Sequence, residues 1–386
     1  MSLTLMIVAV VAVTAWVYLV AFHGGFWLAF RFEDLPPPAS EGPWPRIVAV
    51  VPARDEAAGI ARCVTSILQQ PYPGSLSMIL IDDQSSDGTA DLAARAAAAI
   101  GASDRLTVLR GQPLPSGWTG KLWAVKQGLD LAAQSHPDCV LLTDADIVYS
   151  GNAVTQLATR MRNDNLVMAS VMAQLRCESF AEKFLIPAFV FFFGMLYPFA
   201  WVRRSDRATA AAAGGCILAR FDALKRAGGI ESIRGALIDD CALGARLKTT
   251  GPVWLGFTHD VKSIRASDEI SDVGRMISRS AYAQLRYSLL LLLGMVIAMT
   301  VIFLSPMGLI FAADPLTRTL AAGSWVLMAL AFQPTLRYYG QSPLWGVALP
   351  LISLAYMVFT LNSAYQYLRG RGGMWKGRAQ ANVSAS

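Results

Sequence analysis

The chain has 386 residues, of which 54% are apolar and only 16% are charged, and its formal net charge at pH 7 is +6. The apolar share and the 10% aromatic content exclude a disordered chain, and the positive mean hydropathy indicates membrane segments. Because the positive charge is not gathered into long Lys or Arg runs, a nucleic-acid partner is not expected. The five cysteines form no CxxC pair, which argues against a zinc site or a disulfide framework.

The first thirty residues contain no Asp, Glu, Lys or Arg, and residues 3–22 are almost wholly apolar. Such a stretch is long enough to cross a bilayer core of about 30 Å at about 1.5 Å per residue. We therefore predict a transmembrane helix in residues 1–30, with a cleaved signal peptide as the alternative. Arg31, the first charged residue, lies on its C-terminal side, and the positive-inside rule then places the residues after the helix in the cytoplasm. Residues 31–45 contain three successive prolines and are predicted to be a stiff linker.

Residues 46–287 alternate short apolar runs with helical patterns, which is typical of an α/β domain with a mostly parallel sheet. In such a sheet, ligands bind at the carboxyl ends of the strands. Buried strands are predicted at 47–51, 78–81, 106–109 and 140–142, and helices at 56–69, 89–100 and 121–133.

Residues 184–202 are uncharged and rich in aromatic side chains, but Pro187 and Pro198 interrupt them. A full crossing here would place the acidic motifs before and after it on opposite faces of the membrane. We therefore predict an interfacial segment, with a buried core helix as the alternative.

Residues 288–367 form a second membrane region, in which we predict two or three crossings. The basic residues that precede it again place the central domain in the cytoplasm. The tail at 368–386 is also basic, and three crossings would put it outside. If the middle apolar stretch, at 319–336, is re-entrant, the tail returns to the inside.

Acidic motifs come directly after three of the predicted strands, at 52–56, 82–89 and 143–146. No GxGxxG comes after the first strand and no complete Walker A loop is present, so neither a dinucleotide site nor a P-loop is predicted. Carboxylates alone repel an anionic nucleotide, and a divalent cation must therefore lie between them and the phosphates. Asp144 and Asp146 suit Mg²⁺ or Mn²⁺, although a single DxD pair can also cap a helix. His259 is a candidate third ligand or the end of a strand.

The ordered series of motifs resembles the glycosyltransferase family 2 pattern and covers about residues 46–290. The motif at 52–56 is similar to P-x-x-N-E, with Asp55 in place of Asn, and the one at 82–89 is similar to D-D-x-S-x-D-G-T. Gly120-Lys121 with Ala124 and Gly128 resembles G-K-x-x-A-x-x-x-G. The segment from Asp239-Asp240 to Arg246-Leu247 resembles E-D-x-x-L-x-x-R-L, with Asp239 in place of Glu.

The resemblance implies a GT-A fold and transfer from a nucleotide-sugar donor with inversion at the anomeric carbon. It implies that Asp240 is the catalytic base, whose alternative role is a helix cap. The metal ligands would be Asp144 and Asp146, and Gly214-Gly215 would leave room for donor or acceptor. The implied donor-binding residues are Pro52, Ala53, Arg54, Glu56, Asp82, Asp83, Lys121, Asp144 and Arg286. Of these, Lys121 is otherwise an exposed helix lysine and Arg286 a membrane-interface anchor.

Among family members, the chain resembles most the membrane-bound, hopene-associated glycosyltransferases of bacteria, and more distantly the ceramide glucosyltransferases. This likeness implies a lipid acceptor and a multi-pass protein of the bacterial inner membrane with a cytosolic catalytic domain. The family's Q/R-x-x-R-W motif is represented by residues 282–287, where Arg286-Tyr287 stands for Arg-Trp but Gln284 is one residue too close. That departure argues against processive polymer synthesis. The alternatives are a polyprenyl-phosphate or polysaccharide transferase and, in another class, a non-catalytic membrane scaffold.

Overall fold

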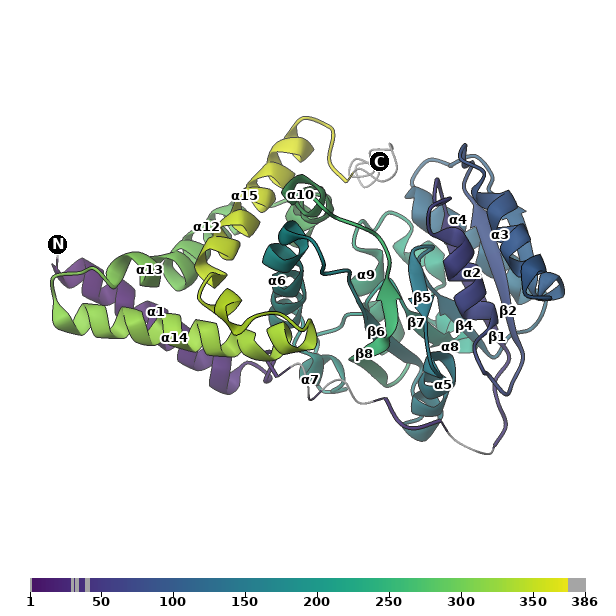
Figure 1. Ribbon diagram of the computed structural model, residues 1–386, viewed down its shortest axis with the longest axis horizontal. Helices are drawn as coiled ribbons and strands as arrows, with labels where there is room; N and C mark the ends of the chain where they lie inside the picture. The colour runs from purple at the N-terminus through teal and green to yellow at the C-terminus, as the bar shows by residue number, and fades with distance from the viewer. Residues whose placement is uncertain (1, 29–30, 32–34, 39–41, 374–386) are drawn as a thin grey trace. The chain divides into compact units, whose positions relative to one another are not determined.

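The computed structural model describes residues 2–28, 31, 35–38 and 42–373 (Figure 1). The tail predicted at 368–386 therefore lies mostly outside the described residues. The chain divides into two compact units, each of which has its own core. Of the described residues, one unit combines those up to Arg31, Cys177–Ala200 and Ser267–Gly373, and the other combines those from Leu35 to Arg176 and Trp201–Ala266.

The second unit is an α/β domain built on one sheet, whose eight strands in the described part of the chain run in the order β3-β2-β1-β4-β7-β6-β8-β5. The pairs β1–β2, β1–β4, β2–β3 and β6–β8 are parallel, and β4–β7, β6–β7 and β5–β8 are antiparallel. The strands are β1 (Ile47–Ala53), β2 (Leu76–Asp82), β3 (Leu106–Arg110), β4 (Cys139–Leu142), β5 (Ile147–Tyr149), β6 (Met168–Gln174), β7 (Ile217–Arg220) and β8 (Val253–Ser263).

Helices flank this sheet, and Figure 1 shows α2, α3 and α4 alongside β1 and β2. The α/β class with a mostly parallel sheet and flanking helices is thus confirmed. The four predicted strands are present and slightly longer than predicted. Strands β1, β2 and β4 are buried as predicted. The predicted burial of 106–109 is wrong, because β3 lies at the edge of the sheet and is mostly exposed. The helices of this unit are α2 (Ile60–Leu68), α3 (Thr89–Ala99), α4 (Gly120–Ala133), α5 (Ala153–Asn163), α8 (Phe221–Arg226) and α9 (Asp239–Lys248).

Strand β1 is buried along its whole length, which explains its uninterrupted apolar sequence. Successive side chains point to opposite faces of the sheet. Ile47 and Val51 lie in the core formed with α2 and α3, whereas Val50 faces α4. At that contact Gly128 lets α4 approach closely, because a Cβ there would lie 2.6 Å from Cγ1 of Val50. The sheet therefore has helices packed on both of its faces.

The first unit is helical, and three of its described helices are long and apolar enough to span a membrane. They are Leu3–Phe22 within α1 (Ser2–Phe22), Leu289–Leu309, and α14 (Pro315–Tyr338). The second of them joins α12 (Leu289–Met299) through a π-helical turn to α13 (Ser305–Leu309). The remaining α-helices of this unit are α6 (Phe180–Leu196), α10 (Ile270–Ser278), α11 (Ala281–Gln284) and α15 (Leu349–Leu368), and the short α7 (Phe199–Val202) spans the point in the chain at which one unit ends and the other resumes.

Helix α6 occupies most of the aromatic segment predicted to be interfacial, and its side chains are mostly buried within the helical unit. Phe191 lies 5.1 Å from Phe332 of α14 between ring centroids, and Phe192 lies 4.8 Å from Tyr356 of α15. The helix begins with a capping box in which Glu182 is fully buried and also accepts a hydrogen bond from the backbone N–H of Ser267. An interfacial position for this helix stays a prediction.

Helix α9 packs so closely on the segment before β7 that only glycine fits at position 244. A Cβ on Gly244 would lie 2.7 Å from the backbone carbonyl carbon of Ala211. We expect Gly244→Ala to destabilise the protein by roughly 1–3 kcal/mol, the usual cost of overpacking, although alanine favours helices. Gly323→Ala in α14 is the matched control, because a Cβ there meets nothing within 4 Å. Thermal unfolding in detergent measures both, and equal melting temperatures would contradict this packing.

Candidate active site

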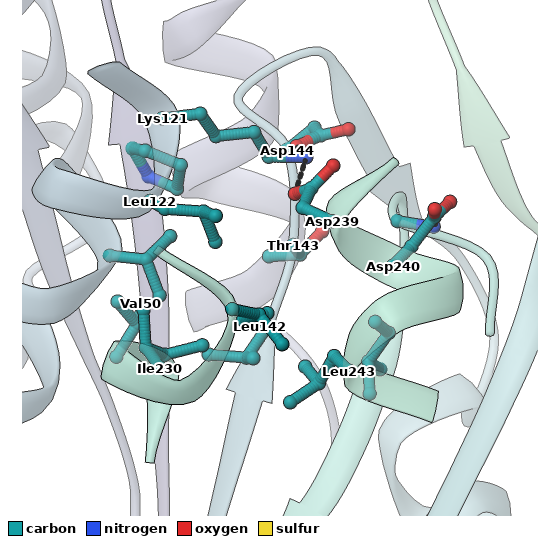
Figure 2. Close-up of a pocket in the computed structure, with 15 residues that line it drawn as sticks. Val50, Lys121, Leu122, Leu142, Thr143, Asp144, Ile230, Asp239, Asp240 and Leu243 are labelled. Atoms are coloured by element: carbon teal, nitrogen blue, oxygen red, sulfur yellow. Dashed lines mark hydrogen bonds and ion pairs between the residues drawn. The ribbon is translucent and has the colours of Figure 1, made fainter. Parts of the chain in front are cut away.

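A pocket lies at the carboxyl ends of β1 and β4, where these strands meet the first turns of α4 and α9 (Figure 2). Its floor is apolar and includes Val50, Leu142 and Leu243. Its rim carries the polar groups, and Figure 2 shows the side chains of Lys121, Asp144 and Asp239 converging there. Of the residues predicted to form a site, the pocket brings together Pro52, Lys121, Asp144, Gly214 and Asp240.

Lys121 connects two carboxylates at the rim of the pocket. Its Nζ lies 2.9 Å from Oδ1 of Asp144 and 3.1 Å from Oδ2 of Asp239. Although burial acts in the opposite direction, Asp144 and Asp239 raise the pKa of Lys121 above its usual value, so that it stays a cation. The side chain is only 20% exposed, and the alternative of an exposed helix lysine is therefore wrong. Thr119 caps the helix by accepting a hydrogen bond from the backbone N–H of Leu122.

Asp240 lies in the first turn of α9, and backbone groups fix both of its carboxylate oxygens. Oδ2 accepts a hydrogen bond from the N–H of Gly214 at 3.0 Å, and Oδ1 accepts one from the N–H of Cys241 at 2.7 Å. Burial and the neighbouring Asp239 raise the pKa of Asp240 to about 6, against the opposing effect of Lys121. The residue before the helix is Ile238, so Asp240 is a first-turn residue rather than the N-cap.

The contact between the backbone N–H of Gly214 and Asp240 suggests why residue 214 is a glycine. A Cβ there would lie 3.3 Å from Oδ2 of Asp240 and 3.4 Å from Nζ of Lys121. The absence of a side chain therefore lets the backbone N–H reach the carboxylate. That Gly214-Gly215 leave room for donor or acceptor stays a prediction.

The residue types at Asp144 and Asp146 fit a divalent cation, because both offer carboxylate oxygens at a strand end. Burial raises the pKa of Asp144, and Asp146 raises it further while Lys121 opposes the change, so an additional cation here would relieve repulsion between the two carboxylates. No three His, Cys, Asp or Glu side chains are grouped for a metal within the described ranges. His259 is exposed on β8, and a role as third ligand stays a prediction. It does not end the strand, because β8 continues to Ser263. Mg²⁺ and Mn²⁺ suit this arrangement, since Mg²⁺ commonly takes one or two carboxylates and completes its shell with water and phosphate.

The loop after β1 is held by the motif at the end of β2. Asp55 has a left-handed backbone with φ of 50°, a conformation that Asp and Asn tolerate better than most residues. The backbone N–H of Ala57 donates to Asp87, and that of Glu56 donates to Thr89. These contacts explain why α2 begins only at Ile60 and not at 56 as predicted. Asp87 and Thr89 therefore shape the loop that carries Glu56.

The two aspartates at the end of β2 have different environments. Asp83 is buried, and Arg54 donates to its backbone carbonyl at 2.6 Å and lies 3.7 Å from its carboxylate. Oδ1 of Asp82 accepts a hydrogen bond from the backbone N–H of Ser85, which is an ordinary turn contact. Ala53 is the last residue of β1, beside Asp82 in the parallel register. Contact of these residues with a donor stays a prediction.

Arg286 belongs to the helical unit, in the turn before α12, and not to the α/β unit that holds the pocket. Arg286 and Tyr287 both have left-handed backbones, with φ of 51° and 55°. The hydroxyl of Tyr282 donates to the carbonyl of Tyr287, whose ring stacks on Tyr367 at 4.4 Å. A role for Arg286 in binding a donor stays a prediction.

Sequence reasoning missed Arg265, which joins two of the predicted motifs. Its Nε lies 3.1 Å from Oδ2 of Asp146, and its Nη2 lies 2.6 Å from Oε1 of Glu56. No motif marks this arginine, and only the pairing of β5 with β8 brings it beside Asp146. The two candidate metal ligands therefore each contact a basic side chain, Asp144 that of Lys121 and Asp146 that of Arg265.

Comparison with known proteins decides the family. Residues 45–256 match the family model described as "Glycosyltransferase like family 2". The chain belongs to this family. Of the solved structures, a mannosyltransferase from Pyrobaculum calidifontis in complex with GDP-Man and Mn²⁺ is similar with a TM-score of 0.57 and 17% identity, covering 94% of this chain and 99% of that one. This similarity shows the GT-A fold.

Curated relatives match a smaller region. An N-acetylglucosaminyltransferase of Rhizobium meliloti is 30% identical over 149 residues, which are 38% of this chain and 32% of the relative. A protein of the same name from Rhizobium leguminosarum bv. viciae is 27% identical over 144 residues, which are 37% of this chain and 31% of the relative. The matched region thus spans about a third of the length of these relatives.

The raised pKa of Asp240 predicts a pH dependence of stability. Because the folded-state pKa of about 6 lies above the usual 3.8, the stabilisation that Asp240 contributes is complete below 3.8 and is lost as the pH rises through about 6. Asp240→Asn removes this titration. We expect the melting temperature of the wild type, relative to that of the variant, to fall between pH 4 and pH 7 in EDTA. A difference that is constant over this range would contradict the buried environment of the carboxylate.

Proposed function

We propose that the chain is a membrane-associated, inverting glycosyltransferase that transfers a sugar from a nucleotide-sugar donor to a lipid acceptor. The observation that carries the proposal is the carboxylate of Asp240, oriented by two backbone N–H groups beside the Lys121–Asp144 ion pair. The GT-A fold and the family support the nucleotide-sugar donor. The three apolar helices support an acceptor that resides in a membrane.

In the proposed reaction, an acceptor hydroxyl attacks the anomeric carbon and passes its proton to Asp240. The bond from the new acceptor oxygen to the anomeric carbon forms as the bond to the diphosphate oxygen breaks, and the nucleoside diphosphate leaves with that electron pair. A single displacement of this kind inverts the anomeric configuration. A carboxylate with a pKa of about 6 is ionised at neutral pH and still basic enough to assist the proton transfer.

Positive charge for the leaving diphosphate is available within the site. Lys121 remains a cation next to Asp144, and its ammonium group can attract phosphate oxygens. When bound, a Mg²⁺ or Mn²⁺ ion would neutralise part of the diphosphate charge, with Asp144 and Asp146 as its protein ligands. The Pyrobaculum mannosyltransferase, which was solved in complex with GDP-Man and Mn²⁺, supports a donor and cation of this kind.

The family likeness favours a location in the bacterial inner membrane and a hopanoid-related lipid as acceptor. The names of the rhizobial relatives make UDP-N-acetylglucosamine the first donor to test. Membranes containing the protein are incubated with the radiolabelled donor and then extracted. Label in the organic phase supports a lipid product, and insoluble label would instead support polysaccharide extension. Mass spectrometry of the labelled lipid distinguishes a hopanoid from a polyprenyl phosphate. No donor turnover or hydrolysis with any sugar nucleotide would favour a non-catalytic scaffold.

We expect Asp240→Asn to lower single-turnover transfer by roughly 10²–10⁴-fold, the usual contribution of positioned acid–base catalysis. Asn has nearly the same shape but cannot take the proton, so donor affinity should change little. Thermal unfolding of the same samples shows whether the variant is folded. Near-normal transfer by a folded variant would move the base elsewhere, with Asp239 as the next candidate. If the variant loses both transfer and folding, the result supports only a structural role for Asp240.

We expect Asp146→Asn to weaken Mn²⁺-dependent binding of UDP by at least about tenfold, because loss of even an indirect metal contact often costs that much. Isothermal calorimetry with Mn²⁺ or with EDTA measures this dependence. Asp164→Asn is the control, since Asp164 is an acidic residue of the same unit that pairs with Arg160. Equal affinity in the wild type and Asp146→Asn, or no effect of EDTA, would refute the metal assignment.

The proposed cytosolic location of the α/β unit can be tested by cysteine labelling. Cys63, Cys139, Cys216 and Cys241 are buried, and Cys177 is partly exposed. A cysteine introduced at the exposed Asp104 in a Cys177→Ser background therefore provides the reporter. In intact cells of an expressing bacterium, an impermeant maleimide should label this site only after lysis. Labelling before lysis would place the unit outside.

A further inference from the structure

Arg265 contacts the DxD pair but has no part in the proposed reaction. Its guanidinium bridges Asp146, with Nε to Oδ2 at 3.1 Å, and Glu56, with Nη2 to Oε1 at 2.6 Å. Oδ2 of Asp146 also accepts a hydrogen bond from the hydroxyl of Ser263 at 2.8 Å. The arginine therefore neutralises a carboxylate that is proposed to bind a divalent cation.

The backbone of the sheet places this arginine. Strand β5 pairs with β8 so that Ile147 lies opposite Ser263, and the backbone N–H of Ile264 donates to the carbonyl of Asp146 at 2.9 Å. Arg265 is the next residue and so begins beside the DxD segment. Its contact with Asp146 results from strand pairing and does not depend on the conformation of a long loop.

The three side chains of the bridge differ in exposure. Those of Glu56 and Asp146 are each 13% exposed, whereas that of Arg265 is 48% exposed. The guanidinium is thus the member of the group that can turn into solvent while the carboxylates keep their positions. It cannot release Asp146 by losing its proton, because arginine stays charged throughout the accessible pH range. Release of Asp146 therefore requires movement of the side chain.

We propose that Arg265 is an internal counter-ion of the DxD site, which a divalent cation must displace from Asp146, so that Arg265 lowers the affinity of the site for the metal. The inference rests on the proposed metal site of the transferase. Before a cation binds, the arginine offsets the negative charges of Glu56 and Asp146 in a partly buried site, as Lys121 offsets that of Asp144. After binding, the metal provides that positive charge. Under this proposal Arg265 competes with the metal for the carboxylate of Asp146.

The test is the affinity for Mn²⁺ alone, without nucleotide, measured on the full-length protein in detergent by electron paramagnetic resonance of free Mn²⁺. We expect Arg265→Gln to bind Mn²⁺ at least about tenfold more tightly than the wild type. A tenfold change corresponds to about 1.4 kcal/mol. A merely structural role predicts the opposite, because a disturbed site would bind metal more weakly. Arg265→Met is a second neutral variant, and either one, once shown to fold, decides the question.

Arg226→Gln is the matched control, because it removes the same charge from the same unit but breaks an ion pair with Asp222 on α8. Its Mn²⁺ affinity should equal that of the wild type. Melting temperatures give a second readout. In EDTA, Arg265→Gln should melt below the wild type, since two carboxylates lose this partner, and its melting temperature should rise more on addition of Mn²⁺.

The outcomes separate the two proposals. If Asp146→Asn abolishes Mn²⁺ binding but the folded neutral variants at Arg265 bind Mn²⁺ no more tightly than the wild type, the counter-ion inference is wrong and the metal site stands. If the wild type and all the Arg265 variants fail to bind Mn²⁺, or if Asp146→Asn binds it as the wild type does, the metal site itself is refuted and the inference falls with it.

Discussion

Charge compensation at the carboxyl edge of the sheet is the constraint on which the candidate site depends. Asp144 and Asp146 lie at one strand end, and Asp239 and Asp240 begin a helix that reaches the same pocket. Like charges repel more strongly in a partly buried site than in water. The chain offsets this repulsion with a lysine, an arginine and two backbone N–H groups. Each of these groups therefore contributes both to the folded site and to the way it receives ligands.

The same balance of charges gives the carboxylates of the site different chemical environments. Asp144 and Asp146 contact cationic side chains. A metal ion can take the place of such a side chain, and a diphosphate can bind to it. Asp240 contacts only neutral backbone donors among the hydrogen bonds described, and burial with its acidic neighbour leaves its pKa near 6. A group of that pKa is suited to accept a proton at neutral pH. The environment thus suits one part of the acidic cluster to the proposed cation binding and Asp240 to the proposed proton transfer, with Gly214 contributing the backbone N–H that it donates to Asp240.

Much of the α/β unit could be predicted from the sequence, because three of its first four strands, β1, β2 and β4, are largely apolar and lead directly into acidic motifs. The convergence of Lys121, Asp144 and Asp240 could be expected once those motifs were placed at strand ends. Three features could not be predicted. The antiparallel pairing of β5 with β8 joins segments more than a hundred residues apart, so the partner of Asp146, Arg265, carried no local signal. Residues 56–59 have a helical composition, yet side chains from the next motif hold them in a turn. Hydrophobicity alone also did not distinguish α6, whose aromatic rings pack on other helices of its unit, from a helix at a membrane surface.

The central claim, that this acidic edge binds a nucleoside diphosphate through a divalent cation, is tested most directly by an experimental structure with UDP and Mn²⁺. Anomalous scattering locates the metal independently of the protein atoms. The account predicts one Mn²⁺ peak contacted by Asp144 and Asp146, phosphate oxygens on the same ion, and the guanidinium of Arg265 turned away from Asp146. A nucleotide bound without a metal peak at these carboxylates, or a peak elsewhere in the unit, would contradict it.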